Sequence, residues 1–197
     1  MGEWILQTIA WFANRNDAQL VIRVHPGERY SKGPSMVAVI AAAFPQLPAN
    51  VCVVAPLEKV NTYDILETAS AVMAFTTTVG LEAAMSGLPA ITVGDTHYRG
   101  RGFTHDPQTW DEYYAILNGI LSDLPAHRPT AQQVEQAWNY AYRFFFQYPR
   151  PFPWRLIEFW NDIEQWPLAR LLGPEGQAAF GQTFKYLTGT PVEWRSL

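Results

Sequence analysis

The chain has 197 residues, of which 48% are hydrophobic and 16% charged, so it carries enough apolar surface for a folded core and is not intrinsically disordered. Its formal net charge of -4 and pI near 5.5 have the wrong sign for a general nucleic-acid-binding protein, and no cluster of basic residues offsets them. This length predicts one domain or a little more.

The single cysteine, Cys52, cannot form an intrachain disulfide, and its place in the apolar run VCVV predicts a buried, small hydrophobic side chain. The N-terminal stretch has no basic region ahead of its apolar residues, and Glu3 and Gln7 interrupt it. These features argue against a signal peptide or a membrane span. We therefore expect a soluble, cytoplasmic protein.

Helix and strand patterns alternate through the first half of the chain. Apolar residues spaced three and four apart predict a helix over 4–14, and a β-branched run closed by proline predicts a strand over 19–24. The further elements expected here are a helix at 35–44, a strand at 51–54, a helix at 62–69 capped by Asn61 or Thr62, a strand at 72–75, a small-residue helix ending at Gly87, and a strand within 88–94. This order predicts an α/β fold with a Rossmann-like parallel sheet and helices on both faces.

Helical patterns dominate the second half. A polar loop over 95–107 is too long for a minimal connection and is a candidate for function. Helices are expected over 110–124 and 130–147, and prolines break the rest into short pieces. We expect an α/β domain over 1–125 and a helical C-terminal extension over 126–197 that packs on it.

Polar side chains follow the predicted strands, at the carboxyl ends where open parallel sheets bind ligands. His25 could present a ring nitrogen to a phosphate, with Pro26 fixing the backbone beside it and Glu28 close by. For an isolated His-Pro pair, a hydrogen bond from His25 to a neighbouring loop is the simpler interpretation. The position after a strand is what favours a phosphate site.

Three consecutive threonines, Thr76, Thr77 and Thr78, lie where a predicted strand meets a predicted helix. Their hydroxyls and the first backbone N–H groups of the helix could bind an anion without a lysine, although one of them could be an ordinary N-cap. Glu82 follows Thr78 by four residues and so shares its helix face. Its carboxylate could accept hydrogen bonds from ribose hydroxyls, the alternative being a solvated helix glutamate.

The loop HYRGRGF places Arg99 and Arg101 between glycines, as a flexible clamp for an acidic sugar or a phosphate would require. Solvated surface arginines are the simpler interpretation of this pair. The sequence lacks the P-loop, GxGxxG, HExxH, paired CxxC, GxSxG and DxD motifs, so we predict neither a metal site nor a bound cofactor.

Three segments together resemble the capsule polysaccharide biosynthesis protein family, which includes Kdo-transferring enzymes of the GT-B glycosyltransferase class. The segments are RVHPGE, VNTYDILETASAVMAFTTTVGLEAAMSGLPAITVG and YRGRGFTHD. The resemblance implies the C-terminal, donor-binding half of a GT-B enzyme that uses a CMP-activated acidic sugar such as Kdo. It also implies that His25, Pro26, Thr76 and Thr77 contact the phosphate of that sugar nucleotide and that Glu82 meets the nucleoside. Serine is commoner in the family at the hydroxyl pair, and threonine keeps the same donor and acceptor groups.

The catalytic residues stay unassigned, because in GT-B enzymes the acceptor site belongs to a preceding domain, and this sequence starts at the donor half. The resemblance implies a glycan or glycolipid acceptor and association of the full enzyme with the inner face of the membrane. Two alternatives remain: a UDP-sugar epimerase-like GT-B domain, and a noncatalytic module whose aromatic C-terminal tail docks on a partner. Most of that tail is expected to be core or interdomain packing.

Overall fold

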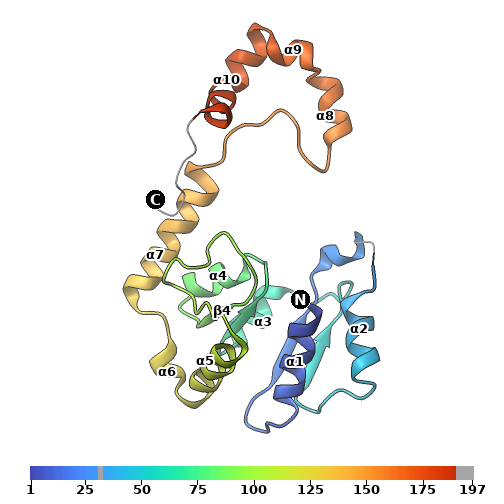
Figure 1. Ribbon diagram of the computed structural model, residues 1–197, viewed down its shortest axis with the longest axis vertical. Coiled ribbons are helices and arrows are strands. Elements are labelled where there is room, and N and C mark those ends of the chain that lie inside the picture. Colours follow the sequence, from blue (N-terminus) through green and yellow to red (C-terminus); the bar gives the residue numbers. More distant parts are fainter. Residues whose placement is uncertain (31–32, 190–197) are drawn as a thin grey trace. The chain divides into compact units, whose positions relative to one another are not determined.

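The computed structural model describes residues 1–30 and 33–189 of the chain (Figure 1). The chain divides into two compact units, residues 1–141 and 142–197. The domain boundary expected at residue 125, and the packing of the extension on the first domain, stay predictions.

The first unit is a mixed α/β structure in which helices and strands alternate through residue 92. Its helices are α1 (Gly2–Phe12), α2 (Met36–Ala43), α3 (Thr62–Thr68), α4 (Val79–Met85), α5 (Trp110–Ser122), α6 (Leu124–His127) and α7 (Ala131–Tyr142), with a short 3-10 helix at Pro26–Tyr30. Its strands are β1 (Leu20–Arg23), β2 (Val51–Val54), β3 (Val72–Ala74) and β4 (Ala90–Thr92). The order of elements expected from the sequence is confirmed.

The strands form two short parallel sheets in the described part of the chain, where a single sheet was expected. Strand β1 pairs with β2, so that Leu20 lies opposite Val51, and β3 pairs with β4, so that Val72 lies opposite Ala90. The loop after β4 returns to it, because His105 N donates to Ala90 O and Thr92 N donates to His105 O, both at 2.8 Å.

Side-chain caps define where several helices begin. Asn61, rather than Thr62, caps α3 by accepting a hydrogen bond from Tyr63 N, and Thr109 caps α5 by accepting one from Glu112 N. Helix α4 ends in the C-terminal glycine motif expected for it. Gly87 has φ +73°, its N–H bonds Ala84 O, and the next N–H bonds Ala83 O.

One hydrophobic core joins the two sheets to α1 and α5. It includes Ile9 and Phe12 of α1, Ile91 of β4 and Leu117 of α5, each at most 3% exposed. A polar contact lies beside this core, where the Thr8 hydroxyl is 2.9 Å from the buried Tyr113 hydroxyl. Helices α1 and α5 are therefore held together by apolar burial and by a shielded hydrogen bond.

The prediction that Cys52 is buried is wrong. Cys52 is exposed and lies opposite Val21 in the β1–β2 register, and Val21 is itself 45% exposed. The first and last residues of the same strand, Val51 and Val54, are buried. The apolar run VCVV is thus a half-buried strand, because this side of the two-stranded sheet is open at Val21 and Cys52.

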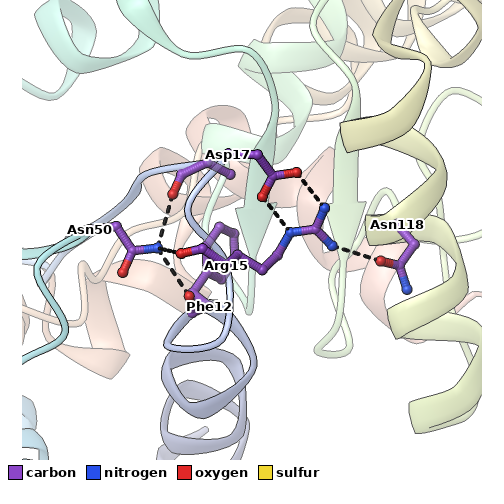
Figure 2. A network of polar contacts seen from close by, with 6 residues as sticks. Phe12, Arg15, Asp17, Asn50 and Asn118 are labelled. Atoms are coloured by element: carbon purple, nitrogen blue, oxygen red, sulfur yellow. Dashed lines mark hydrogen bonds and ion pairs between the residues drawn. The ribbon is translucent and has the colours of Figure 1, made fainter.

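A polar network fastens the end of α1 to the start of β2 (Figure 2). Asn50 Nδ2 donates to the carbonyl oxygens of Phe12, Arg15 and Ala18, each at 3.0 Å. The guanidinium of Arg15 binds both carboxylate oxygens of Asp17, at 2.9 and 2.6 Å, and donates to Asn118 Oδ1 of α5 at 2.9 Å. The Asn50 amide therefore binds three backbone carbonyls at and before the start of β1, and the Arg15 guanidinium links the same turn to α5.

Replacing Asn50 tests this network. Asn50→Ala removes the side-chain donor of three carbonyls, of which Phe12 O keeps a bond from Arg15 N, and should lower the free energy of unfolding by about 1–3 kcal/mol. Asn50→Asp should cost more because it places a carboxylate among carbonyl oxygens. Urea denaturation of the full chain measures both changes. Asn14→Ala is the matched control, since Asn14 makes one exposed bond to Ala10 O, and it should shift stability by less than about 0.5 kcal/mol. An Asn50→Ala effect as small as the control would contradict this role.

The second unit is helical. It contains a π-helical turn at Arg143–Gln147, then α8 (Phe159–Gln165), α9 (Leu168–Leu172) and α10 (Pro174–Thr188). The helix expected over 130–147 therefore becomes α7 followed by the π-helical turn. Internal hydrogen bonds close this unit: Thr183 Oγ1 donates to Pro151 O at 2.8 Å, and Trp154 Nε1 donates to Trp166 O at 2.9 Å.

Many large apolar side chains of the second unit are exposed, although most of the aromatic tail was expected to be packed. Those at least half exposed include Phe146, Phe152, Leu156, Ile157, Trp160, Leu168, Leu172 and Leu187. No helix in residues 1–30 and 33–189 is long and apolar enough to cross a bilayer.

Candidate functional site

The His25 turn follows β1 by two residues and determines which ring nitrogen carries the proton when His25 is neutral. His25 Nδ1 accepts a hydrogen bond from Gly27 N at 3.0 Å, and the ring is exposed. Because a nitrogen that accepts cannot also carry the proton, a neutral His25 holds its proton on Nε2. The expected hydrogen bond between His25 and a neighbouring loop residue is therefore present, and it leaves an N–H donor on Nε2.

Glu28 lies in the same turn but serves the helix after it. Its Oε1 accepts from the backbone N of Met36 at 2.9 Å, at the first residue of α2, while Ser35 caps the same helix by accepting from Ala38 N. One carboxylate oxygen of Glu28 is thus engaged in holding α2.

The three threonines after β3 differ in what their hydroxyls do. Thr78 Oγ1 donates to Glu82 Oε1 at 2.8 Å, which confirms that the two residues share a face of α4. Thr77 Oγ1 accepts from Val79 N at 3.4 Å, so its own proton stays available for donation, and Thr76 is exposed. The hydroxyls with spare donor capacity are therefore those of Thr76 and Thr77.

Glu82 also faces α3. Its carboxylate raises the pKa of the Tyr63 phenol, chiefly by charge repulsion of the phenolate, so the Tyr63 hydroxyl lies close to Glu82. Tyr63 is 58% exposed. Glu82 is consequently a partly buried carboxylate held between a threonine hydroxyl and an exposed phenol, rather than a solvated helix glutamate.

Tyr98 connects the long loop to the threonine turn. Its ring is fully buried, and its hydroxyl donates to Thr77 O at 2.6 Å. Burial raises the pKa of the Tyr98 phenol, so the group remains a proton donor. Gly80 permits this approach, since a Cβ added there would lie 2.4 Å from the Tyr98 hydroxyl oxygen. The hydrogen bond from the buried Tyr98 side chain thus restrains the backbone of the threonine turn.

Arg99 lies inside its loop in this structure. Its guanidinium donates to the carbonyls of Thr92, Gly94 and Pro107, and so joins the end of β4 to the end of the loop. Those donors hold the loop closed on itself, where a flexible clamp had been expected.

Arg101 packs against the aromatic ring of Tyr140. Its guanidinium carbon is 5.4 Å from the ring centre of Tyr140 on α7, and the Tyr140 ring stacks on His97. His97 Nδ1 is 3.0 Å from the Tyr140 hydroxyl, which donates to His97 O at 2.7 Å. Partial burial and the nearby Arg101 charge lower the pKa of the His97 imidazole, which favours its neutral form at neutral pH.

The structure thus brings Thr76, Thr77, Thr78 and Glu82 together, with Tyr98 beneath them and Tyr63 beside them. His25, Pro26 and Glu28 form a separate turn, and no hydrogen bond in the described part of the chain joins that turn to the threonines. Across residues 1–30 and 33–189, no group of three His, Cys, Asp or Glu side chains is placed to hold a metal ion.

A comparison with known protein families shows the family to which the chain belongs. The family model for capsule polysaccharide biosynthesis proteins matches residues 3–115, more than half of the chain. The chain belongs to that family. The match covers the His25 turn, the threonine turn and the loop that carries Arg99 and Arg101. Searches of curated proteins and of solved structures gave no match.

Sequence reasoning missed the tyrosines that complete the site. Tyr63, Tyr98 and Tyr140 lie on α3, the long loop and α7, and only the fold brings them near Glu82, Thr77 and His97. One local signal was available for Tyr98, because an aromatic residue within a polar loop that is otherwise rich in glycine often anchors that loop to the core.

A double-mutant cycle tests the Tyr98 anchor. Tyr98→Phe should cost about 0.5–1.5 kcal/mol of unfolding free energy through the lost bond to Thr77 O. Gly80→Ala should cost about 1–3 kcal/mol because the added methyl overlaps the Tyr98 hydroxyl. Together they should cost less than the sum, since removing the hydroxyl removes the closest overlap.

Thermal or urea unfolding of the four proteins measures this coupling. Gly2→Ala is the control, because nothing lies within 4 Å of a Cβ added at that position. Strict additivity of the two changes would show that Tyr98 and Gly80 do not touch.

Proposed function

We propose that this protein is the donor-nucleotide-binding part of a glycosyltransferase of capsule polysaccharide synthesis, with a GT-B, Rossmann-like domain that takes a CMP-activated acidic sugar such as Kdo. Membership of the capsule polysaccharide biosynthesis family supports the biological setting. The observation that carries the choice of site is the His25 turn, in which the bond from Gly27 N leaves Nε2 as an outward N–H donor.

The chemistry of a CMP-activated sugar is compatible with the residue types of the His25 turn and the threonine turn. When the bond between the sugar and the phosphate breaks, the electron pair goes to the phosphate oxygen, and the CMP that leaves gains negative charge. An imidazole N–H and the Thr76 and Thr77 hydroxyls are donors suited to that charge. Glu82, held by Thr78, is suited to accept hydrogen bonds from ribose hydroxyls.

The other parts of the proposal concern the acceptor, the location and the sugar. The acceptor would be a glycan or glycolipid bound by a separate acceptor domain, and the work would take place in the cytoplasm at the inner face of the membrane. Arg99 and Arg101 are the arginines proposed to meet an acidic sugar; Arg101 packs on Tyr140, and the guanidinium of Arg99 donates to three carbonyls of its own loop and of β4.

Calorimetric titration with CMP tests the role of His25. Because Nδ1 is already engaged with Gly27, the ligand contact falls to Nε2, and His25→Ala should weaken CMP binding by about 1–3 kcal/mol. Two matched variants separate the ring nitrogens. His25→Gln carries an amide N–H at about the reach of Nε2 and should retain part of the affinity, whereas His25→Asn replaces only the Nδ1 position and should bind as weakly as His25→Ala. Unchanged CMP affinity in His25→Ala would remove this residue from the site.

The threonine hydroxyls and metal independence form a second test. Thr76→Val with Thr77→Val should weaken CMP binding and keep the fold, because valine suits the end of a strand, while EDTA should leave binding by the unaltered protein intact. Thr104→Val is a control, since the Thr104 hydroxyl donates to Asp106 away from the threonine turn. Binding that needs a divalent metal, or UDP bound more tightly than CMP, would direct attention to a different transferase or to an epimerase.

A further inference from the structure

A pocket of the second unit lies between α10 and the segment that precedes α8. It has a volume of about 320 Å³ and is lined by Arg150, Gln182, Lys185 and Tyr186. The three lining residues of α10 are spaced three and four apart, so they share one face of the helix. All four side chains are exposed, so a ligand can reach the pocket from solvent.

One buried hydroxyl holds the two sides of the pocket together. Thr183 of α10 is 4% exposed, and its Oγ1 donates to Pro151 O at 2.8 Å. This bond fixes the backbone next to Arg150 against α10. The guanidinium carbon of Arg150 lies 5.8 Å from the ring centre of Tyr186, a distance typical of a cation–π contact. The Arg150 side chain is therefore placed over the wall of the pocket by contacts at both of its ends.

The two cations of the pocket have no carboxylate partner in the described part of the chain. Two other arginines of this unit, Arg155 and Arg170, each form an ion pair with a carboxylate, whereas Arg150 and Lys185 form none. Like charges that line one pocket repel each other, and an anion bound between them replaces that repulsion with attraction. The pocket therefore has the charge of an anion-binding site.

The charge and the size of the pocket favour a sugar phosphate over a simple ion. Two cations match a phosphate monoester, which carries a charge of about −1.5 to −2 at neutral pH, and the planar guanidinium of Arg150 suits its oxygens. A volume of about 320 Å³ equals that of roughly ten water molecules in the liquid, and a phosphate group fills only part of it. The amide of Gln182 and the ring of Tyr186 then line the space left for the hydroxyls and the carbon skeleton of a sugar.

We propose that this pocket binds the phosphate monoester of a phosphorylated sugar, with Arg150 and Lys185 on the phosphate and Gln182 and Tyr186 on the sugar. Membership of a polysaccharide biosynthesis family makes phosphorylated sugars a class of ligand suited to the protein. The pocket lies outside residues 3–115, which match the family model, and it uses no residue of the His25 turn or the threonine turn. The proposal thus needs no assumption about which nucleotide is bound.

Calorimetric titration of the full chain with glucose 6-phosphate tests the proposal. Glucose 6-phosphate should bind more tightly than inorganic phosphate, and glucose should give no heat of binding at the same concentrations. Arg150→Gln and Lys185→Gln should each weaken binding about tenfold, because each removes a charged donor. Arg150→Lys keeps the charge without the planar fork and should lose less. Lys59→Gln is the control, since it removes one exposed positive charge from the first unit, and it should leave the affinity unchanged.

Two further variants separate the sugar contacts and the proposed nucleotide site. Gln182→Ala should weaken the binding of glucose 6-phosphate and leave that of inorganic phosphate unchanged, because the amide is assigned to the sugar. His25→Ala should leave the binding of glucose 6-phosphate unchanged. Circular dichroism of each variant verifies folding.

Three outcomes would overturn the proposal: no binding of glucose 6-phosphate by the unaltered protein, binding that the Arg150 and Lys185 changes do not affect, and equal affinity for inorganic phosphate. Loss of binding in His25→Ala would also overturn it, because the phosphate would then occupy the proposed nucleotide site. CMP titration of the same samples keeps the two proposals apart, since the His25 and Arg150 variants are measured with both ligands.

Discussion

The hydrogen bond from the buried Tyr98 hydroxyl to Thr77 O is the contact on which the candidate site depends. It ties the loop after β4 to the turn after β3, two segments that carry candidate site residues from different parts of the sequence. The Tyr98 ring, packed with Leu81 and Phe103, gives this bond a dry environment in which an unpaired carbonyl would be costly. The bond thus fixes the backbone that carries the hydroxyls of Thr76 and Thr77, and under the proposed function this order would lower the entropy cost of binding a nucleotide there.

The parts of the fold that follow from local rules could be predicted. The strand at 51–54, the end of α4 at Gly87 and the shared face of Thr78 and Glu82 depend on periodicity, glycine conformation and helical spacing. These rules act within a few residues, so one sequence is enough to apply them.

Features that depend on how the folded chain packs could not be predicted in the same way. The run VCVV does not reveal which side of its strand will be covered, so Cys52 was assigned to the core although it is exposed. The sequence of the long loop shows two arginines between glycines, but only the folded loop shows that Arg99 donates to the carbonyls of Thr92 and Pro107. The acceptors of Arg99 lie only seven and eight residues away in sequence, but the guanidinium reaches them only because the loop folds back on the end of β4.

Helix α4, which follows the threonine turn, buries three very small residues beside the larger Leu81. Gly80, Ala83 and Ala84 are all buried, and the backbone of the helix lies close to its neighbours as a result. Close contact of this kind leaves no spare volume, so each of these positions accepts only the smallest residues. A larger side chain at Gly80 would therefore displace the Tyr98 hydroxyl and with it the backbone of the threonine turn. The size of one residue in α4 thus decides whether the loop after β4 can reach the turn after β3.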